Sequence, residues 1–168
     1  MLCYLFDAQG RLLLLHRHRS PNQDLYSPVG GKLEQGIGES PTACAIREIK
    51  EETSLHVEPG DLHLTGLVSE SGFDDAMHWM MFLYEVSHPI EVKAGLIDEG
   101  ILEWHDVDLV SQLPIPQTDQ RVIWPLFNRY RGKFFCAHIN CSGGDIRWRI
   151  EQPACDVTDW SDRAIEDC

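Results

Sequence analysis

The chain has 168 residues, of which 43% are hydrophobic and 24% charged, a composition typical of one globular domain with a small appendage. Its 14 Lys and Arg residues against 27 Asp and Glu give a formal net charge of -13, which disfavours nucleic-acid binding by displacement of counterions. The first residues, MLCYLFDAQGR, lack the basic region of a signal peptide, and no apolar stretch has membrane-spanning length. We therefore expect a cytoplasmic protein without nucleic-acid or membrane partners.

The first part of the chain predicts a β-hairpin, a loop and a helix. Two apolar runs, MLCYLFD and RLLLLHRHR, flank the turn AQG, which indicates a hairpin. The loop SPNQDLYSPVGG follows, and its prolines and glycines interrupt regular structure. A helix is predicted to begin after Ser40, a favourable N-cap followed by Pro41 at the first helical position, and to run to about Ser54.

This helix is predicted to have two distinct faces when its residues are projected down the helix axis. The apolar face, which we expect to pack on the core, carries Ala43, Ile46, Ile49 and Thr53. The other face gathers Cys44, Glu48, Glu51 and Glu52. A face crowded with carboxylates is thus expected opposite the core face.

The second part of the chain alternates strands with one further helix. The segments LHLTGLVSE, MHWMMFLYEVS and ILEWHDV have strand character, and TDQRVIWPLFNRYRG is predicted helical with a kink or boundary at Pro125. The end of the chain predicts a hairpin over residues 133–152, either closing one edge of the domain or pairing with another subunit in a homodimer. We therefore divide the chain into a domain over residues 1–132 and an extension over 133–168, a C-terminal β-hairpin with an acidic tail.

The six cysteines are scattered without a C-x-x-C pair, which argues against a disulfide framework. Cys136, His138 and Cys141 lie close enough in sequence to suggest a zinc site. No fourth ligand is evident, and alternation along a strand explains two of these side chains. We expect reduced thiols.

The glutamates of the helix alone do not decide a function, because like charges three or four residues apart on a solvated helix cost only about 0.2–0.5 kcal/mol per pair. The preceding Gly30 and Gly31 change the interpretation, since a glycine corner brings bare backbone close to the same helix. Carboxylates and a carbonyl together form a hard oxygen site that suits Mg²⁺. A phosphate-binding P-loop is the competing interpretation, and it fails because Leu33 follows Lys32 where Ser or Thr is required.

The segment from Gly31 to Leu55 resembles the Nudix box, whose pattern is G-x5-E-x7-R-E-U-x-E-E-x-G-U with U aliphatic. The positions are filled by Gly31, Glu39, Arg47-Glu48-Ile49-Lys50-Glu51-Glu52 and Leu55. Two departures matter. Seven residues separate Gly31 from Glu39 where the family usually has five, which places the extra pair in the loop, and Ser54 replaces the penultimate glycine.

The resemblance implies an α/β/α sandwich with a mixed β-sheet and hydrolysis of a nucleoside diphosphate linked to another moiety. It also implies roles for individual residues. Mg²⁺, for which Mn²⁺ can substitute, would be bound by Glu48, Glu51, Glu52 and the carbonyl of Gly30. Arg47 would orient these glutamates, and Glu39 would brace Arg47.

Further site residues are expected outside the box. The loop DEGILEW resembles an acidic loop of antimutator-type members, so Glu99 is the candidate for an additional metal ligand or catalytic base, with Glu70 as the second choice. The cations expected near substrate phosphates are Arg17, Arg19 and Lys32. The aromatic residues considered for stacking on a base are Tyr26, Phe73 and Trp79, and Trp79 is expected in the core because it lies in an apolar run.

The leading hypothesis is a Mg²⁺-dependent pyrophosphohydrolase acting on a small nucleotide. Its alternative is a catalytically silent Nudix-fold module that senses a nucleotide. The intact Arg47, Glu48, Glu51 and Glu52 favour the enzyme, because a sensor can lose them without cost. A modified or ordinary (d)NTP is the first substrate candidate, by resemblance of LYSPVGGKLE, and a nucleotide sugar is the second.

Overall fold

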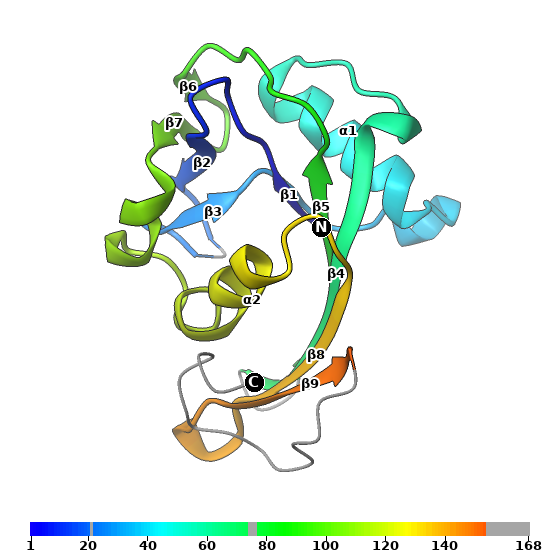
Figure 1. Ribbon diagram of the computed structural model, residues 1–168, viewed down its shortest axis with the longest axis vertical. Coiled ribbons are helices and arrows are strands. Elements are labelled where there is room, and N and C mark those ends of the chain that lie inside the picture. The colour runs from blue at the N-terminus through cyan, green and yellow to red at the C-terminus, as the bar shows by residue number, and fades with distance from the viewer. Residues whose placement is uncertain (21, 74–76, 154–168) are drawn as a thin grey trace. The chain divides into compact units, whose positions relative to one another are not determined.

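The structure, a computed structural model, describes residues 1–20, 22–73 and 77–153 (Figure 1). The chain divides into two compact units. Unit 1 comprises Met1–His63 and Tyr84–Pro116, and unit 2 comprises Leu64–Leu83 and Gln117–Cys168. The C-terminal hairpin falls within unit 2, and the boundary expected between residues 132 and 133 remains a prediction.

Unit 1 contains a four-stranded antiparallel sheet in the order β3-β2-β7-β6 (Figure 1). Its strands are β3 (Tyr26–Pro28), β2 (Leu12–Arg17), β7 (Gly100–His105) and β6 (Gly95–Ile97). The run of four leucines in β2 is at most 2% exposed, which explains why this strand is apolar at consecutive positions rather than alternate ones. Strand β2 therefore forms the centre of the core of this unit.

The first predicted hairpin is present over a short stretch only, where the N–H of Leu13 also donates to the carbonyl of Leu5 at 2.9 Å. The N–H of Asp7 donates to the carbonyl of Arg11, and an isolated bridge joins Phe6 to Leu12. Strand β1 (Leu2–Tyr4) is assigned to the larger sheet, whereas β2 belongs to the four-stranded sheet. The two apolar runs therefore enter different sheets, a choice that local turn chemistry does not encode.

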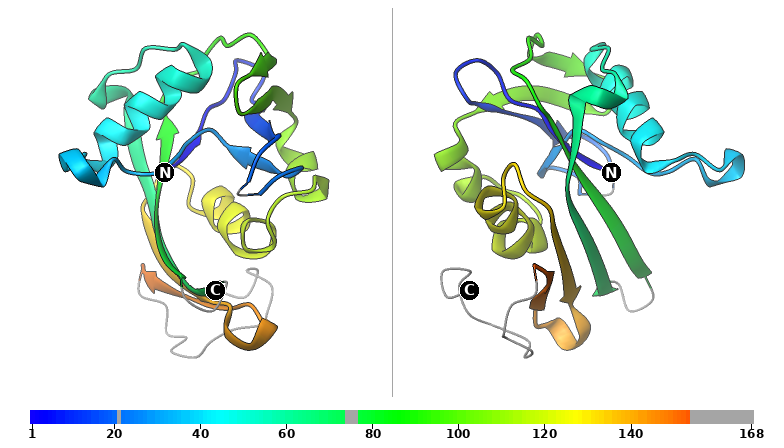
Figure 2. Two further views of the ribbon diagram at one scale, coloured as in Figure 1. Left: turned by 180° about the vertical axis from the view of Figure 1, so that it is seen from behind. Right: turned by 45° about the vertical axis from the view of Figure 1, so that its right-hand side comes forward.

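Helix α1 (Pro41–Thr53) begins and ends close to where the sequence predicts, and the views in Figure 2 show it as one continuous helix. The Oγ of Ser40 accepts a hydrogen bond from the N–H of Ala43 at 3.2 Å, and Pro41 takes the first helical position. Ser54 ends the helix in the left-handed region at φ 61°. This is the position where the family pattern has glycine, the residue that adopts this conformation without strain.

The predicted core face of α1 is correct for Ile49, which is buried, and wrong for Ala43. Ala43 is exposed and Ile46 is half-buried. The buried residues of the helix are Cys44, Ala45, Glu48, Ile49 and Glu52. Two of the three carboxylates, Glu48 and Glu52, thus pack inward together with the apolar Ile49.

The larger sheet has the order β1-β5-β4-β8-β9 and mixes parallel and antiparallel neighbours (Figure 1). Strands β4 (Leu62–Phe73) and β5 (Met77–Val86) contribute residues to both units. Strand β4 pairs in parallel with β8 (Phe135–Asn140), and β8 pairs antiparallel with β9 (Arg147–Gln152). The last two strands form the hairpin that the sequence predicts.

The predicted second helix is divided into a π-helical turn (Asp119–Ile123) and α2 (Trp124–Arg129), with Pro125 in the first turn of α2. The boundary at this proline agrees with its inability to donate a backbone hydrogen bond inside a helix. Alternate residues of β8 are buried, and the core of unit 2 is built from Phe127, Phe135, Ala137, Ile139, Trp148 and Ile150. Within the described ranges, no helix is long and apolar enough to cross a membrane.

Candidate metal and substrate site

The glycine corner in unit 1 brings backbone into contact with the carboxylate of Glu48. Gly30 has φ 147°, and a Cβ there would collide with the carbonyl of Met1. A Cβ on Gly31 would collide with the carboxylate of Glu48. Gly30 therefore requires glycine for conformation and close approach, whereas a side chain at position 31 would displace the carboxylate of Glu48.

Arg47 holds three glutamates together. Its Nε and Nη2 donate to the two carboxylate oxygens of Glu39 at 2.8 and 3.0 Å, the parallel geometry that suits a guanidinium. Its Nη1 donates to Glu48 at 2.7 Å and to Glu51 at 3.0 Å. The hydrogen bonds from Arg47, followed by the one from the Glu34 amide, lower the pKa of Glu39 to about 2. Arg47 and Glu39 thus have the geometry of an orienting residue and its brace.

Two of the carboxylates are buried. The side chain of Glu48 is 10% exposed, and burial raises its pKa although Arg47 opposes the shift. Glu52 is 6% exposed, and neither carboxylate oxygen has a hydrogen-bond partner among the described residues. Burial, then the negative charges of Glu99 and Glu48, raise the pKa of Glu52 to about 8, and Arg17 and the nearby backbone N–H of Gly30 offset part of this rise. The carboxylate of Glu52 therefore lacks a counter-charge in direct contact.

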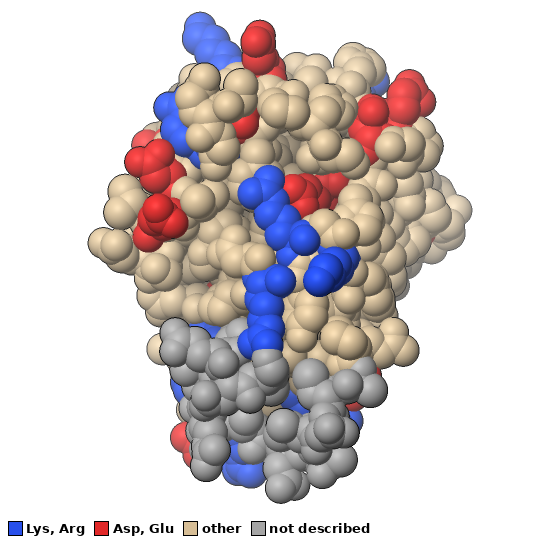
Figure 3. Space-filling view, viewed as in Figure 1, with Lys and Arg blue, Asp and Glu red and all other residues tan. Residues whose placement is uncertain are grey.

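A divalent cation fits these residues. Unpartnered carboxylate oxygens are costly when buried, and hard oxygen donors are the ligands that Mg²⁺ prefers. In the part of the chain that the structure describes, however, no group of three or more Asp, Glu, His or Cys side chains converges as a metal site. Arg47 holds Glu48 and Glu51, so binding through Glu51 requires this 58% exposed side chain to turn away from Arg47. Acidic side chains are also not gathered into one continuous patch on the face seen in Figure 3.

Arg17 and Glu99 form an ion pair beside these carboxylates. Arg17 is the last residue of β2, and its Nη2 lies 3.0 Å from the Oε2 of Glu99 in the turn between β6 and β7. The N–H of His18 donates to the carbonyl of Glu99 at 2.9 Å, which fixes the turn to the end of β2. Both charges influence the pKa of Glu52. The fold thus brings Arg17 and Glu99, residues far apart in sequence, to the candidate site.

The other predicted site residues have less specific surroundings. Arg19 and Lys32 are exposed, and the carbonyl of Lys32 accepts a hydrogen bond from Arg47 at 3.1 Å. Glu70 belongs to unit 2, where burial raises its pKa and a hydrogen bond from Thr118 opposes the rise. Burial and the charge of Glu70 also raise the pKa of Asp119 to about 7. The sequence analysis named Glu70 alone and did not pair it with Asp119, because the two residues are 49 positions apart and share no motif.

Tyr26 is engaged within unit 1 rather than presented on a loop. Its ring stacks on His16 at 4.6 Å and meets His105 edge-on at 4.9 Å, and its hydroxyl donates to Glu103 at 2.8 Å. Burial, followed by the hydrogen bond to Glu103, raises its pKa to about 12. Cross-strand partners of this kind follow from sheet register, which the sequence pattern does not specify.

The remaining aromatic and cysteine expectations concern unit 2. Trp79 is half-buried and Phe73 is 47% exposed. The Nδ1 of His138 lies 2.6 Å from the Oγ of Ser69, and the described residues assemble no zinc site around it. The strand interpretation of this segment agrees with β8, whose residues alternate between buried and half-buried.

A family model described as the NUDIX domain matches residues 1–125. The chain belongs to the Nudix family. Over 120 residues it is 29% identical to the uncharacterized Nudix hydrolase YvcI of Bacillus subtilis, covering 71% of this chain and 73% of YvcI.

Two solved Nudix structures share the fold. A mutator MutT protein from Bacillus halodurans has a TM-score of 0.69 and 25% identity, over 89% of this chain and 95% of that protein. The NUDIX domain of Shewanella oneidensis NrtR, in complex with ADP ribose, has a TM-score of 0.60 and 18% identity, over 76% and 82%. The predicted family and fold class are therefore confirmed, and the Nudix domain supports a hydrolase of the pyrophosphatase type.

Proposed function

We propose that this Nudix hydrolase is a Mg²⁺-dependent pyrophosphohydrolase that cleaves the diphosphate linkage of a nucleoside diphosphate derivative. The observation that carries the proposal is the buried carboxylate of Glu52, whose two oxygens lack hydrogen-bond partners in the described structure. A buried carboxylate near two others, Glu48 and Glu99, is destabilising unless a cation or a proton compensates it. We therefore attribute the buried carboxylate of Glu52 to cation binding, because a bound cation would offset the cost of burying its charge.

The residues that would hold Mg²⁺, or Mn²⁺ as its substitute, are Glu48, Glu51, Glu52 and the carbonyl of Gly30. Arg47 is proposed to keep Glu48 and Glu51 close to the metal position, and the two parallel hydrogen bonds from Arg47 to Glu39 support this role. The matched Nudix model covers all of these residues. Nudix hydrolases generally use divalent metals, and the choice of Mg²⁺ rests on the oxygen-only donor set.

The bound cation would neutralise the diphosphate and lower the pKa of the attacking water. Glu99 is proposed either to accept the proton of that water or to join the metal ligands, in an orientation held by its ion pair with Arg17. Arg17, Arg19 and Lys32 are proposed to supply positive charge to the phosphate oxygens. Positioning and charge neutralisation would supply most of the rate enhancement, as is general for phosphoryl transfer.

The first substrate candidate is a modified or ordinary (d)NTP, and a nucleotide sugar is the second. The ADP ribose held by the NrtR domain supports the broader class, since it is a nucleoside diphosphate derivative bound to the same fold. The second candidate function is a catalytically silent nucleotide sensor. It is favoured by one observation, that Arg47 Nη1 holds Glu48 and Glu51 so that the carboxylates do not converge.

The proposal is tested by incubating a panel of (d)NTPs and nucleotide sugars with Mg²⁺ and measuring phosphate after a coupled phosphatase. We expect turnover of at least one compound, and we expect Glu51→Gln and Glu52→Gln to lower kcat by about a hundredfold or more with an unchanged circular dichroism spectrum. Wild-type turnover in both variants would exclude the metal-site assignment. Tight binding of a nucleotide without turnover would instead support the sensor.

A further inference from the structure

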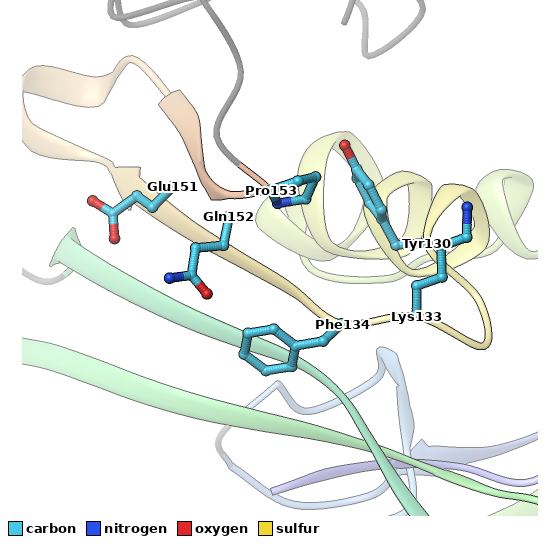
Figure 4. A pocket seen from close by; sticks show the side chains of 6 residues that line it. All are labelled: Tyr130, Lys133, Phe134, Glu151, Gln152 and Pro153. Carbon is cyan, nitrogen blue, oxygen red and sulfur yellow. The ribbon is translucent and has the colours of Figure 1, made fainter.

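A hollow of about 640 Å³ lies in unit 2, outside the candidate site (Figure 4). Its lining carries Lys133 and Glu151, side chains of opposite charge, together with the rings of Tyr130 and Phe134. In Figure 4, the Glu151 carboxylate points away from the ring of Tyr130. This mixed lining does not define one class of ligand. The turn before β7 in unit 1, by contrast, has a defined relation to the candidate site.

The turn between β6 and β7 carries Glu99. Ile97 pairs with Gly100, so the turn consists of Asp98 and Glu99 alone. Two-residue hairpin turns favour the types that place positive φ at the first turn residue. Neither Asp98 nor Glu99 has positive φ. The turn therefore lacks the favoured conformation of a short hairpin, and its position depends on contacts with the neighbouring strand β2.

These contacts come from the end of β2 and the residue that follows it. The N–H of His18 donates to the carbonyl of Glu99 at 2.9 Å, and the Nη2 of Arg17 lies 3.0 Å from the Glu99 carboxylate. Arg17 is also the residue that pairs with Gly100 in the register of β2 and β7. Two consecutive residues thus hold both the backbone and the side chain of Glu99.

Gly100 allows β7 to approach β2 this closely. A Cβ at this buried position would collide with the carbonyl oxygen of His16 and lie 3.1 Å from the Cα of Arg17. Both are backbone atoms of β2, whose four leucines are at most 2% exposed, and a packed strand of this kind does not yield easily. A side chain at position 100 would therefore displace the start of β7, and with it the turn that carries Glu99.

We propose that Gly100 is a positioning residue of the hydrolase: its missing side chain lets β7 begin against the backbone of β2, which places the carboxylate of Glu99 at the candidate site. Gly100 acts through Glu99 alone, so the inference rests on the proposed role of Glu99 in hydrolysis. A carboxylate that takes a proton from water or binds a metal tolerates little displacement, because a shift of about 1 Å can cost about a hundredfold in rate.

Steady-state kinetics of Gly100→Ala, alone and combined with Glu99→Gln, tests the proposal. We expect Gly100→Ala to lower kcat by about 10–100-fold. In the Glu99→Gln background, the same substitution is expected to lower kcat by less than about twofold, because the carboxylate that it displaces is already absent. Equal losses in both backgrounds would overturn the proposal, since a purely structural defect does not depend on Glu99. A wild-type kcat in Gly100→Ala would overturn it as well.

Amide hydrogen exchange tests the geometry without reference to activity, which separates failure of this inference from failure of the proposed function. The His18 amide, which donates to the Glu99 carbonyl, is expected to exchange about tenfold faster or more in Gly100→Ala. The Leu13 amide, which donates to the carbonyl of Leu5 at 2.9 Å, is the internal control and should keep its rate. An unchanged rate at His18 would contradict the positioning role.

The matched control is Gly60→Ala in unit 1, whose added Cβ meets open space and which should leave kcat and the exchange rate of His18 unchanged. Should Gly100→Ala fail to fold, Glu99→Asp tests the same requirement, because it withdraws the carboxylate by one methylene group without adding a side chain to β7. This variant is expected to lower kcat by about tenfold or more. Full activity in Glu99→Asp would show that close placement of the carboxylate is not needed, and the proposal would then be wrong.

Discussion

Replacing Glu52 by glutamine is expected to make the metal-free protein more stable at alkaline pH although it lowers kcat. Burial and the charges of Glu99 and Glu48 raise the pKa of Glu52 from 4.5 to about 8. Because this pKa is higher in the folded than in the unfolded chain, the folded protein binds an additional proton between these two values. The free energy of unfolding is therefore highest for this group below pH 4.5, falls as the pH rises, and levels off above about pH 8.

The size of the effect follows from the two pKa values. A rise from 4.5 to about 8 corresponds to about 5 kcal/mol at about 1.4 kcal/mol per pKa unit. Rearrangement around the ionised group reduces this figure, so we expect a loss of about 2–4 kcal/mol between about pH 5 and pH 9. Glutamine does not ionise, and the Glu52→Gln variant should not show this loss.

The assay is urea unfolding in the presence of a chelator, with wild type and variant compared at each pH so that all other titrating groups cancel. The control is Glu51→Gln, the same substitution on a 58% exposed side chain, which should leave most of the wild-type loss in place. Adding Mg²⁺ near pH 8 is expected to raise the free energy of unfolding of the wild type more than that of Glu52→Gln. A difference between wild type and Glu52→Gln that stays constant from about pH 5 to pH 9 would refute the reasoning.

Three further substitutions have defined outcomes. Arg47→Lys is expected to lower kcat by about 10–100-fold, because an ammonium group cannot hold Glu39 in two parallel hydrogen bonds. Steady-state kinetics measures the change in kcat, and an unchanged kcat would contradict the role of Arg47. Gly66→Ala is expected to lower the free energy of unfolding by about 1–3 kcal/mol, because the added Cβ would meet the Phe135 ring. Urea unfolding measures this loss. The control is Gly60→Ala, whose added Cβ meets open space and which should not show the loss. Ser54→Gly is expected to raise that free energy by about 0.5–1 kcal/mol at unchanged activity, because φ is 61° at this helix end, and a lower melting temperature would count against the explanation.

Local signals in the sequence predicted several elements correctly. The cap residues Ser40 and Pro41 located the start of α1, and alternation around the SGGD turn located the hairpin of β8 and β9. These features depend on neighbouring residues alone, so they can be read from a short window. The first hairpin was less predictable, because which sheet each strand joins depends on strands elsewhere in the chain.

The inward face of α1 shows where helix periodicity fails. The apolar positions Ala43 and Ile46 are exposed or half-buried, whereas Glu48 and Glu52 are buried. A projection of the helix assigns the most apolar side to the core because burial of apolar surface drives folding. It cannot anticipate that two carboxylates are buried in this interface.

By itself the sequence determined the Nudix box, the helix that carries it and the family, since these rest on residue types at fixed spacing within a single segment. Only the tertiary structure decided that Arg17 pairs with Glu99, 82 residues away, and that both act on the charge of Glu52. It also decided that Glu52 loses its contact with water. Burial and long-range charge pairing depend on which strands become neighbours, and that choice is made by the fold as a whole.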